Sequence, residues 1–185
     1  MTELDPAKIY PYVVPDTYVP NWDGGFVFWD LEHALKVILV IDLGHVVSSI
    51  RPQELEGIGM SEETAWDTAF RNLHNDWGDQ RMWVNVLNGD AGERCMVVEN
   101  HWSAAATMLL RGIQEAAAEY LGGWDFFATA PDTSFLLFFP QKLSPIFKSR
   151  LDQVISDRSV LFRKPLTKKL FLIGESGITE SDETW

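Results

Sequence analysis

The stretch Leu35–Asp42 (LKVILVID) limits the possible folds more than any other part of the chain. It is almost wholly apolar and rich in β-branched residues, which is typical of a strand covered on both faces. It is also far shorter than the ~20 apolar residues that a membrane-spanning helix needs. The sequence therefore predicts a globular fold in which other elements pack over this strand.

The remainder of the chain alternates between strand and helix signals. Ser61 is a favourable N-cap, and Glu62 and Glu63 follow where the helix dipole favours acids. The spacing predicts helices over 61–78, 103–121 and 144–157, and a short helical turn from Pro52. Further strands are expected at 26–29, 46–50, 82–87, 94–98, 125–129, 134–139 and 169–173. Tight hairpins require antiparallel pairs, so the predicted class is α+β: a mixed, mostly antiparallel sheet with three main helices packed on it.

The length of 185 residues fits one domain, expected over residues 26–174. Residues 1–25 hold several prolines, so they are expected to form an extended, Pro-rich lead-in on the surface. Residues 175–185 are acidic and rich in Ser and Thr, and are expected to be a frayed tail.

Negative charge is concentrated in the first two thirds of the chain. Residues 1–60 carry nine acids against three bases and residues 61–123 carry ten against four, which accounts for the whole net charge of −12. This disfavours nucleic acid and anionic membrane as partners and favours a basic protein such as a toxin domain. The alternative is that the acidity serves only solubility. The segment 142–169 is basic and has no assigned role.

The sequence contains few candidates for chemistry. It has one cysteine, Cys95, and lacks a secretory signal of the usual kind, so a cytoplasmic location is expected. Phosphate-binding glycine motifs and histidine pairs with zinc-ligand spacing are absent, and no cofactor or metal is expected. His74 and His101 are candidate general bases, and each is more typical of a structural position. A pair of carboxylates of the glycosidase type stays open as well, because its two members need not be close in sequence.

Tryptophan is the most unusual component, with eight residues in the chain. Several lie next to acids, a combination suited to receiving Arg or Lys side chains of a partner. The alternative is that each fills the edge of the core. The predicted partner-binding residues are Asp23, Trp29, Asp30, Asp76, Trp77, Asp79 and Trp102.

Residues 33–73 contain a buried strand, a second strand, the segment 55–59, Ser61-Glu62-Glu63 and the run Ala69-Phe70-Arg71-Asn72-Leu73. In this order they resemble the YtpQ-type bacterial family, and the likeness extends loosely over residues 33–140. The resemblance implies a bacterial cytoplasmic domain and carries no reaction with it.

Three functions follow as hypotheses. The first is a non-enzymatic binding protein, in particular an immunity protein that neutralises a bacterial toxin by capping its basic surface. The second is a regulatory domain of the YtpQ type that binds a small molecule or peptide. The third is an unrecognised hydrolase that uses His74 or His101.

Overall fold

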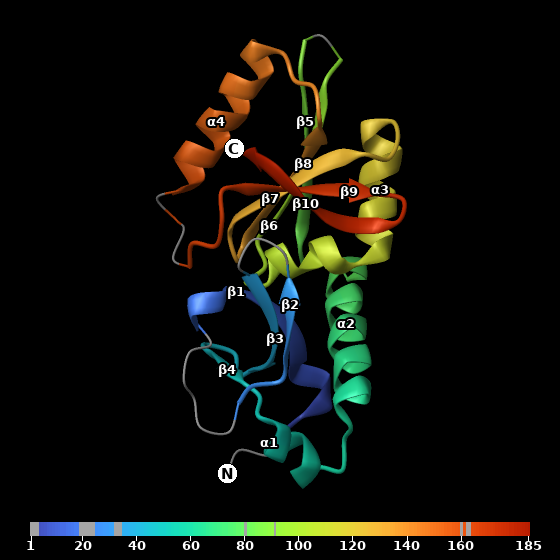
Figure 1. The fold of residues 1–185 in the computed structure, drawn as a ribbon, viewed down its shortest axis with the longest axis vertical. Coiled ribbons are helices and arrows are strands. Elements are labelled where there is room, and N and C mark those ends of the chain that lie inside the picture. Colours follow the sequence, from blue (N-terminus) through green and yellow to red (C-terminus); the bar gives the residue numbers. More distant parts are fainter. Residues whose placement is uncertain are drawn as a thin grey trace. The chain divides into compact units, whose positions relative to one another are not determined.

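The computed structural model describes residues 4–18, 25–31, 35–79, 81–90, 92–159, 161 and 164–185. The chain packs into two compact units, Met1–Met82 and Trp83–Trp185 (Figure 1). The sequence predicted one domain over 26–174, and the boundary between the units falls within that range. The predicted α+β class is confirmed, and every pairing between the described strands is antiparallel. In the described part of the chain, no helix has both the length and the apolar character needed to cross a membrane.

The first unit is a small sheet with one long helix. Its strands are β1 (Ile9–Pro15), β2 (Phe28–Leu31), β3 (Leu35–Asp42) and β4 (Val47–Ser49). The order is β1-β3-β2, and β4 also pairs with β3. Two short 3-10 helices, η1 (Pro6–Lys8) and η2 (Asp16–Tyr18), flank β1, and α1 (Pro52–Gly57) and α2 (Glu62–Gly78) follow β4. As predicted, β3 is buried along nearly its whole length.

Strand β1 corrects the prediction of a surface lead-in. Its residues are buried almost throughout, and it pairs with β3 from Ile9↔Ile41 to Pro15↔Leu35. The prolines do not prevent this, because β1 is an outer strand of the described sheet. Pro11 and Pro15 stand four residues apart, so both turn their missing N–H toward the same side, away from β3.

Helix α2 begins as the sequence predicts, because the Ser61 side chain accepts a bond from the Thr64 amide at 3.2 Å. Ala65 and Ala69 pack with Ile9, Leu39 and Ile41 into the core of this unit. The small side chains let the helix approach the sheet closely, and they fix which side of α2 remains in solvent.

The second unit is a six-stranded sheet in the order β10-β9-β7-β8-β6-β5. Its strands are β5 (Trp83–Asn88), β6 (Arg94–Glu99), β7 (Phe126–Asp132), β8 (Phe135–Pro140), β9 (Lys169–Gly174) and β10 (Gly177–Thr184). Figure 1 shows α3 (Arg111–Leu121) and α4 (Pro145–Ser159) on either side of this sheet. Phe147 and Leu151 of α4 pack on Cys95 and Val97 of β6 in one apolar cluster.

The helix predicted over 103–121 is instead two elements. A 3-10 helix, η3 (Ala104–Leu109), is followed by Leu110, whose extended backbone (φ −80°, ψ 116°) interrupts the helix before α3. Ser103 makes no side-chain cap. The amide of Ala105, which would have no acceptor inside a helix that begins at Ser103, donates to the carbonyl of Thr133 at 2.9 Å and ties the start of η3 to the segment between β7 and β8.

Residues of the predicted frayed tail form β10, which pairs with β9. The register between the two strands shifts between Glu180 and Thr184. Isoleucine and threonine favour a strand, and at an outer strand the acids can remain in solvent.

The β5–β6 hairpin agrees with the sequence and has a defined turn. Gly89 donates to the Glu93 carbonyl at 2.7 Å, and Gly92 donates to the Gly89 carbonyl at 3.1 Å. Gly92 has φ +84°, the left-handed conformation that a bulge at this position requires. The turn therefore fixes the register of β5 against β6.

Candidate functional site

The predicted partner-binding residues occupy different settings. Asp23 lies outside the described residues. Trp29 and Asp30 belong to β2, Asp76 and Trp77 to α2, and Asp79 follows α2 directly, all in the first unit. Trp102 belongs to the second unit, after β6.

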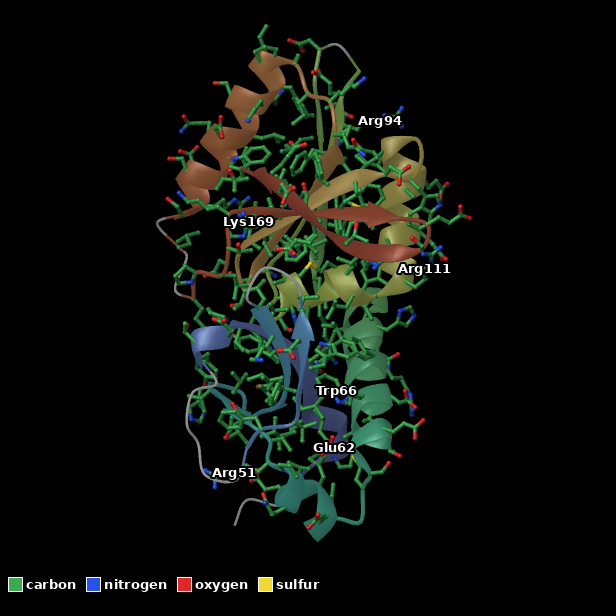
Figure 2. The ribbon with its side chains drawn as sticks, in the orientation of Figure 1. Arg51, Glu62, Trp66, Arg94, Arg111 and Lys169 are labelled. Atoms are coloured by element: carbon green, nitrogen blue, oxygen red, sulfur yellow. The ribbon has the colours of Figure 1, made fainter. Side chains whose placement is uncertain are left out.

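Trp29 is the centre of an aromatic cluster in the first unit. Its ring stacks on Trp66 of α2 with a centroid distance of 5.1 Å and an interplanar angle of 14°, and lies 5.6 Å from Phe70. Trp66 and Phe70 are four residues apart, so they stand one above the other on α2. Trp29 remains 42% exposed. The aromatic cluster, Trp29, Trp66 and Phe70, therefore presents stacked ring surface to solvent (Figure 2 labels Trp66).

Two exposed acids border this cluster. Glu63 and Asp67 are also four residues apart on α2. Glu63 stands three residues before Trp66 and Asp67 three residues before Phe70, so each acid neighbours one ring of the cluster on the helix surface. Both side chains lie on the solvent side of the helix. Among the described residues neither forms an ion pair. Together with the aromatic cluster they form what we call the α2 face: Trp29, Trp66, Phe70, Glu63 and Asp67.

The surrounding charge has the same sign. Residues 1–82, which form the first unit, contain fourteen acids and five bases, a net charge of −9 out of the total of −12. An exposed, unpaired carboxylate in such a field attracts cations and not anions. The α2 face can therefore receive an Arg or Lys side chain both by charge and by the ring faces.

Asp30 and Asp76 are engaged within the unit. Asp30 pairs with Lys36, whose ammonium also lies 4.5 Å from the centroid of Phe28. Asp76 is only 5% exposed and accepts a bond from Arg81 Nη1 at 2.9 Å. Burial, and next a side-chain hydrogen bond to Asp76, raise the pKa of Tyr10 above its ordinary value. Asp76 thus links Tyr10 of β1 to Arg81, which follows the end of α2.

Trp77 and Asp79 lie at the end of α2. The Trp77 ring meets His74 edge-on at a centroid distance of 5.4 Å. Asp79 is exposed, and its amide donates to the carbonyl of Asn75 at 2.8 Å. These two residues could extend the α2 face toward its C-terminal end, because Trp77 follows Phe70 by seven residues, two helical turns.

Trp102 adjoins a groove of about 270 Å³ in the second unit. Its ring stacks on His101 at a centroid distance of 5.2 Å. At the groove lies Glu99, 4% exposed, which pairs with Arg158 of α4 and accepts a bond from Asn85 Nδ2 at 2.6 Å. The sequence does not indicate this pair, because the two residues stand 59 positions apart. The one local signal is a lone acid at the end of the apolar strand β6.

The residues considered for catalysis do not assemble into a nucleophilic site. Cys95 is fully buried under α4, and burial raises the pKa of its thiol, so the thiolate is disfavoured. His101 accepts a bond from the Ser103 amide at its Nδ1 atom, at 3.2 Å, which fixes the loop after β6. Within the described residues, no group of three or more His, Cys, Asp or Glu side chains could hold a metal ion.

Comparison with protein-family models, with curated proteins and with solved structures gives no match for this chain. The likeness to the YtpQ-type family therefore stays a prediction, and the site has to be interpreted from its own geometry.

Proposed function

We propose that this protein is a non-enzymatic binding protein that recognises a basic surface of another protein through the α2 face. The observation that carries the proposal is the position of Glu63 and Asp67, exposed and without an ion pair among the described residues, beside the stacked and partly exposed Trp29. A guanidinium or ammonium group gains from the carboxylates and from the ring face at once.

The charge of the first unit supports a role in rapid association. A net −9 on 82 residues creates a negative potential that draws a basic protein toward this unit before contact. Such steering raises the association rate and falls with ionic strength. Acidity that served only solubility would need no aromatic surface among the carboxylates.

Within this class we propose an immunity protein of a bacterial cell, which neutralises a toxin by covering its basic active surface. An inhibitor of this kind needs no catalytic residues of its own. It needs a pre-formed surface with aromatic anchors, and Trp29 is held in place by Trp66 and Phe70 at centroid distances of 5.1 and 5.6 Å.

The proposal is tested by capture of partners on wild-type protein and on the variant Glu63→Lys/Asp67→Lys. The control Asp182→Lys/Glu183→Lys makes the same change of charge at exposed positions of β10. We expect one basic protein in stoichiometric amount on the wild type and on the control, and at least about tenfold less on the α2 variant, since two ion pairs are reversed. Equal capture on both variants would refute the α2 face as the site.

A second candidate function is the binding of a small molecule in the groove at Trp102. The observation in its favour is that Arg158, Glu99 and His101 meet the aromatic side chains Trp83 and Trp102 around one opening. A thermal shift with one class of metabolite, abolished by Trp102→Ala and retained by Glu63→Lys/Asp67→Lys, would favour this function over the first.

A further inference from the structure

The second unit ends on an outer strand that is unusually exposed. β5 lies at one end of the six-stranded sheet, and its only partner among the described strands is β6. Trp83, Val84 and Val86 are 57%, 41% and 49% exposed. The strand has the sequence WVNVLN, without a charge or a proline. Outer strands normally carry such residues because they prevent pairing with other chains.

The opposite end of the same sheet is protected in the usual way. β10 has the sequence GITESDET, with three acids, and its register against β9 shifts between Glu180 and Thr184. Charges and irregular register both oppose the addition of a further strand. The two outer strands therefore differ, and only β5 offers a regular, uncharged edge.

The hairpin turn identifies which backbone groups of β5 face outward. The bond from the Gly89 amide to the Glu93 carbonyl fixes these residues as a hydrogen-bonded pair. Bonded and non-bonded pairs alternate along an antiparallel ladder. The pairs Leu87↔Cys95 and Asn85↔Val97 are then bonded to β6, while Val84 and Val86 direct their N–H and C=O groups away from the sheet.

We infer that β5 pairs antiparallel with β5 of a second copy of this chain, about a two-fold axis at Asn85. In this register the outward groups of Val84 bond to those of the partner's Val86, and the reverse. Because β5 carries no charge, self-pairing places no like charges opposite one another. The second unit also has only three of the twelve net negative charges, so joining two of them involves little repulsion.

A groove beside β5 supports a second copy as the occupant. It has a volume of about 480 Å³ and lies between β5 and α4, with Leu87, Val97 and Val154 in its lining. In the proposed register the partner's Trp83 stands opposite Leu87, on the face of the sheet that α4 covers. The exposed indole of each copy would thus be buried over the groove of the other, in an isologous contact.

The first test is the mass in solution of the full chain over a range of concentrations, by sedimentation equilibrium. We expect the mass to rise from the 21.0 kDa of one chain to twice that value. Val84→Lys/Val86→Lys places like charges opposite each other and should weaken the dimer by at least about tenfold. Val46→Lys, at a 52% exposed valine of the first unit, should leave it unchanged. A single-chain mass at every concentration, or equal dimerisation of the two variants, would overturn the inference.

A cross-link tests the axis without relying on the lysine variant. Asn85→Cys should form a disulfide between two chains under mild oxidation, because directly opposite residues of a non-bonded pair have closely spaced Cβ atoms. Asn88→Cys should not, because its two copies would lie about 20 Å apart along the strands. The native Cys95 is buried and does not compete. Cross-linking at position 88 and not at 85, or pairing of β5 only with a strand of a different protein, would contradict a second copy in this register.

Discussion

Arg158 of α4 pairs with both carboxylate oxygens of Glu99 at the end of β6. Glu99 is almost fully buried, whereas the Arg158 side chain is 42% exposed. The pair joins the helix to the outer part of the sheet, next to the strand that we infer to dimerise.

Replacing Arg158 by methionine should lower the free energy of unfolding by about 2 kcal/mol, because it leaves a buried carboxylate without its charged partner. The double variant Glu99→Gln/Arg158→Met should lose less than the single variant, since no buried charge is left behind. Urea unfolding of the three proteins measures both differences. Equal losses in the two variants would contradict a desolvated Glu99.

Tyr10 should make stability depend on pH above its ordinary pKa of 10.0, because its pKa in the folded protein is raised. At a pH between the ordinary pKa and the raised pKa of the folded protein, the unfolded chain loses the phenolic proton of Tyr10 and the folded chain keeps it. Stability is therefore complete below pH 10 and should fall above it, by up to ~1.4 kcal/mol per pH unit. Tyr10→Phe should have a flatter profile over the same range in chemical denaturation. Parallel profiles for the two proteins would exclude this contribution.

Cys95 should be inert in the folded protein. Burial raises the pKa of its thiol, so a thiol reagent at pH 8 should label it only after denaturation. Cys95→Ser should destabilise the protein by about 1–3 kcal/mol, because it buries a hydroxyl in an apolar cluster, and Cys95→Ala should cost less. Rapid labelling of native protein would contradict the packing of this residue.

The sequence predicts well where local signals and tertiary packing agree. The apolar run of β3, the Ser61 cap of α2 and the glycines of the β5–β6 turn each specify their element by composition or backbone conformation. β1 and β10 were missed because prolines and acids are unfavourable in a central strand but are tolerated in an outer one. The break at Leu110 has no local signal, because neither proline nor glycine occurs in residues 103–111.

The candidate site was predictable only in part. The four-residue spacing of Trp66 and Phe70 is visible in the sequence, but the stacking of Trp29 on Trp66 depends on how β2 lies against α2. Asp76 has the same local appearance as an exposed acid, yet it is buried and paired with Arg81. Charge and residue type can therefore suggest a binding surface, whereas burial decides which carboxylates can present themselves to a partner.

We propose that a basic protein binds the acidic first unit. The most direct measurement is affinity capture from the source organism at low and high salt, with the bound proteins identified by mass spectrometry. We expect one stoichiometric basic partner that is captured at low salt and largely lost at high salt, because steering and exposed ion pairs are screened. A bait without a partner, or a partner that is acidic or insensitive to salt, would contradict it.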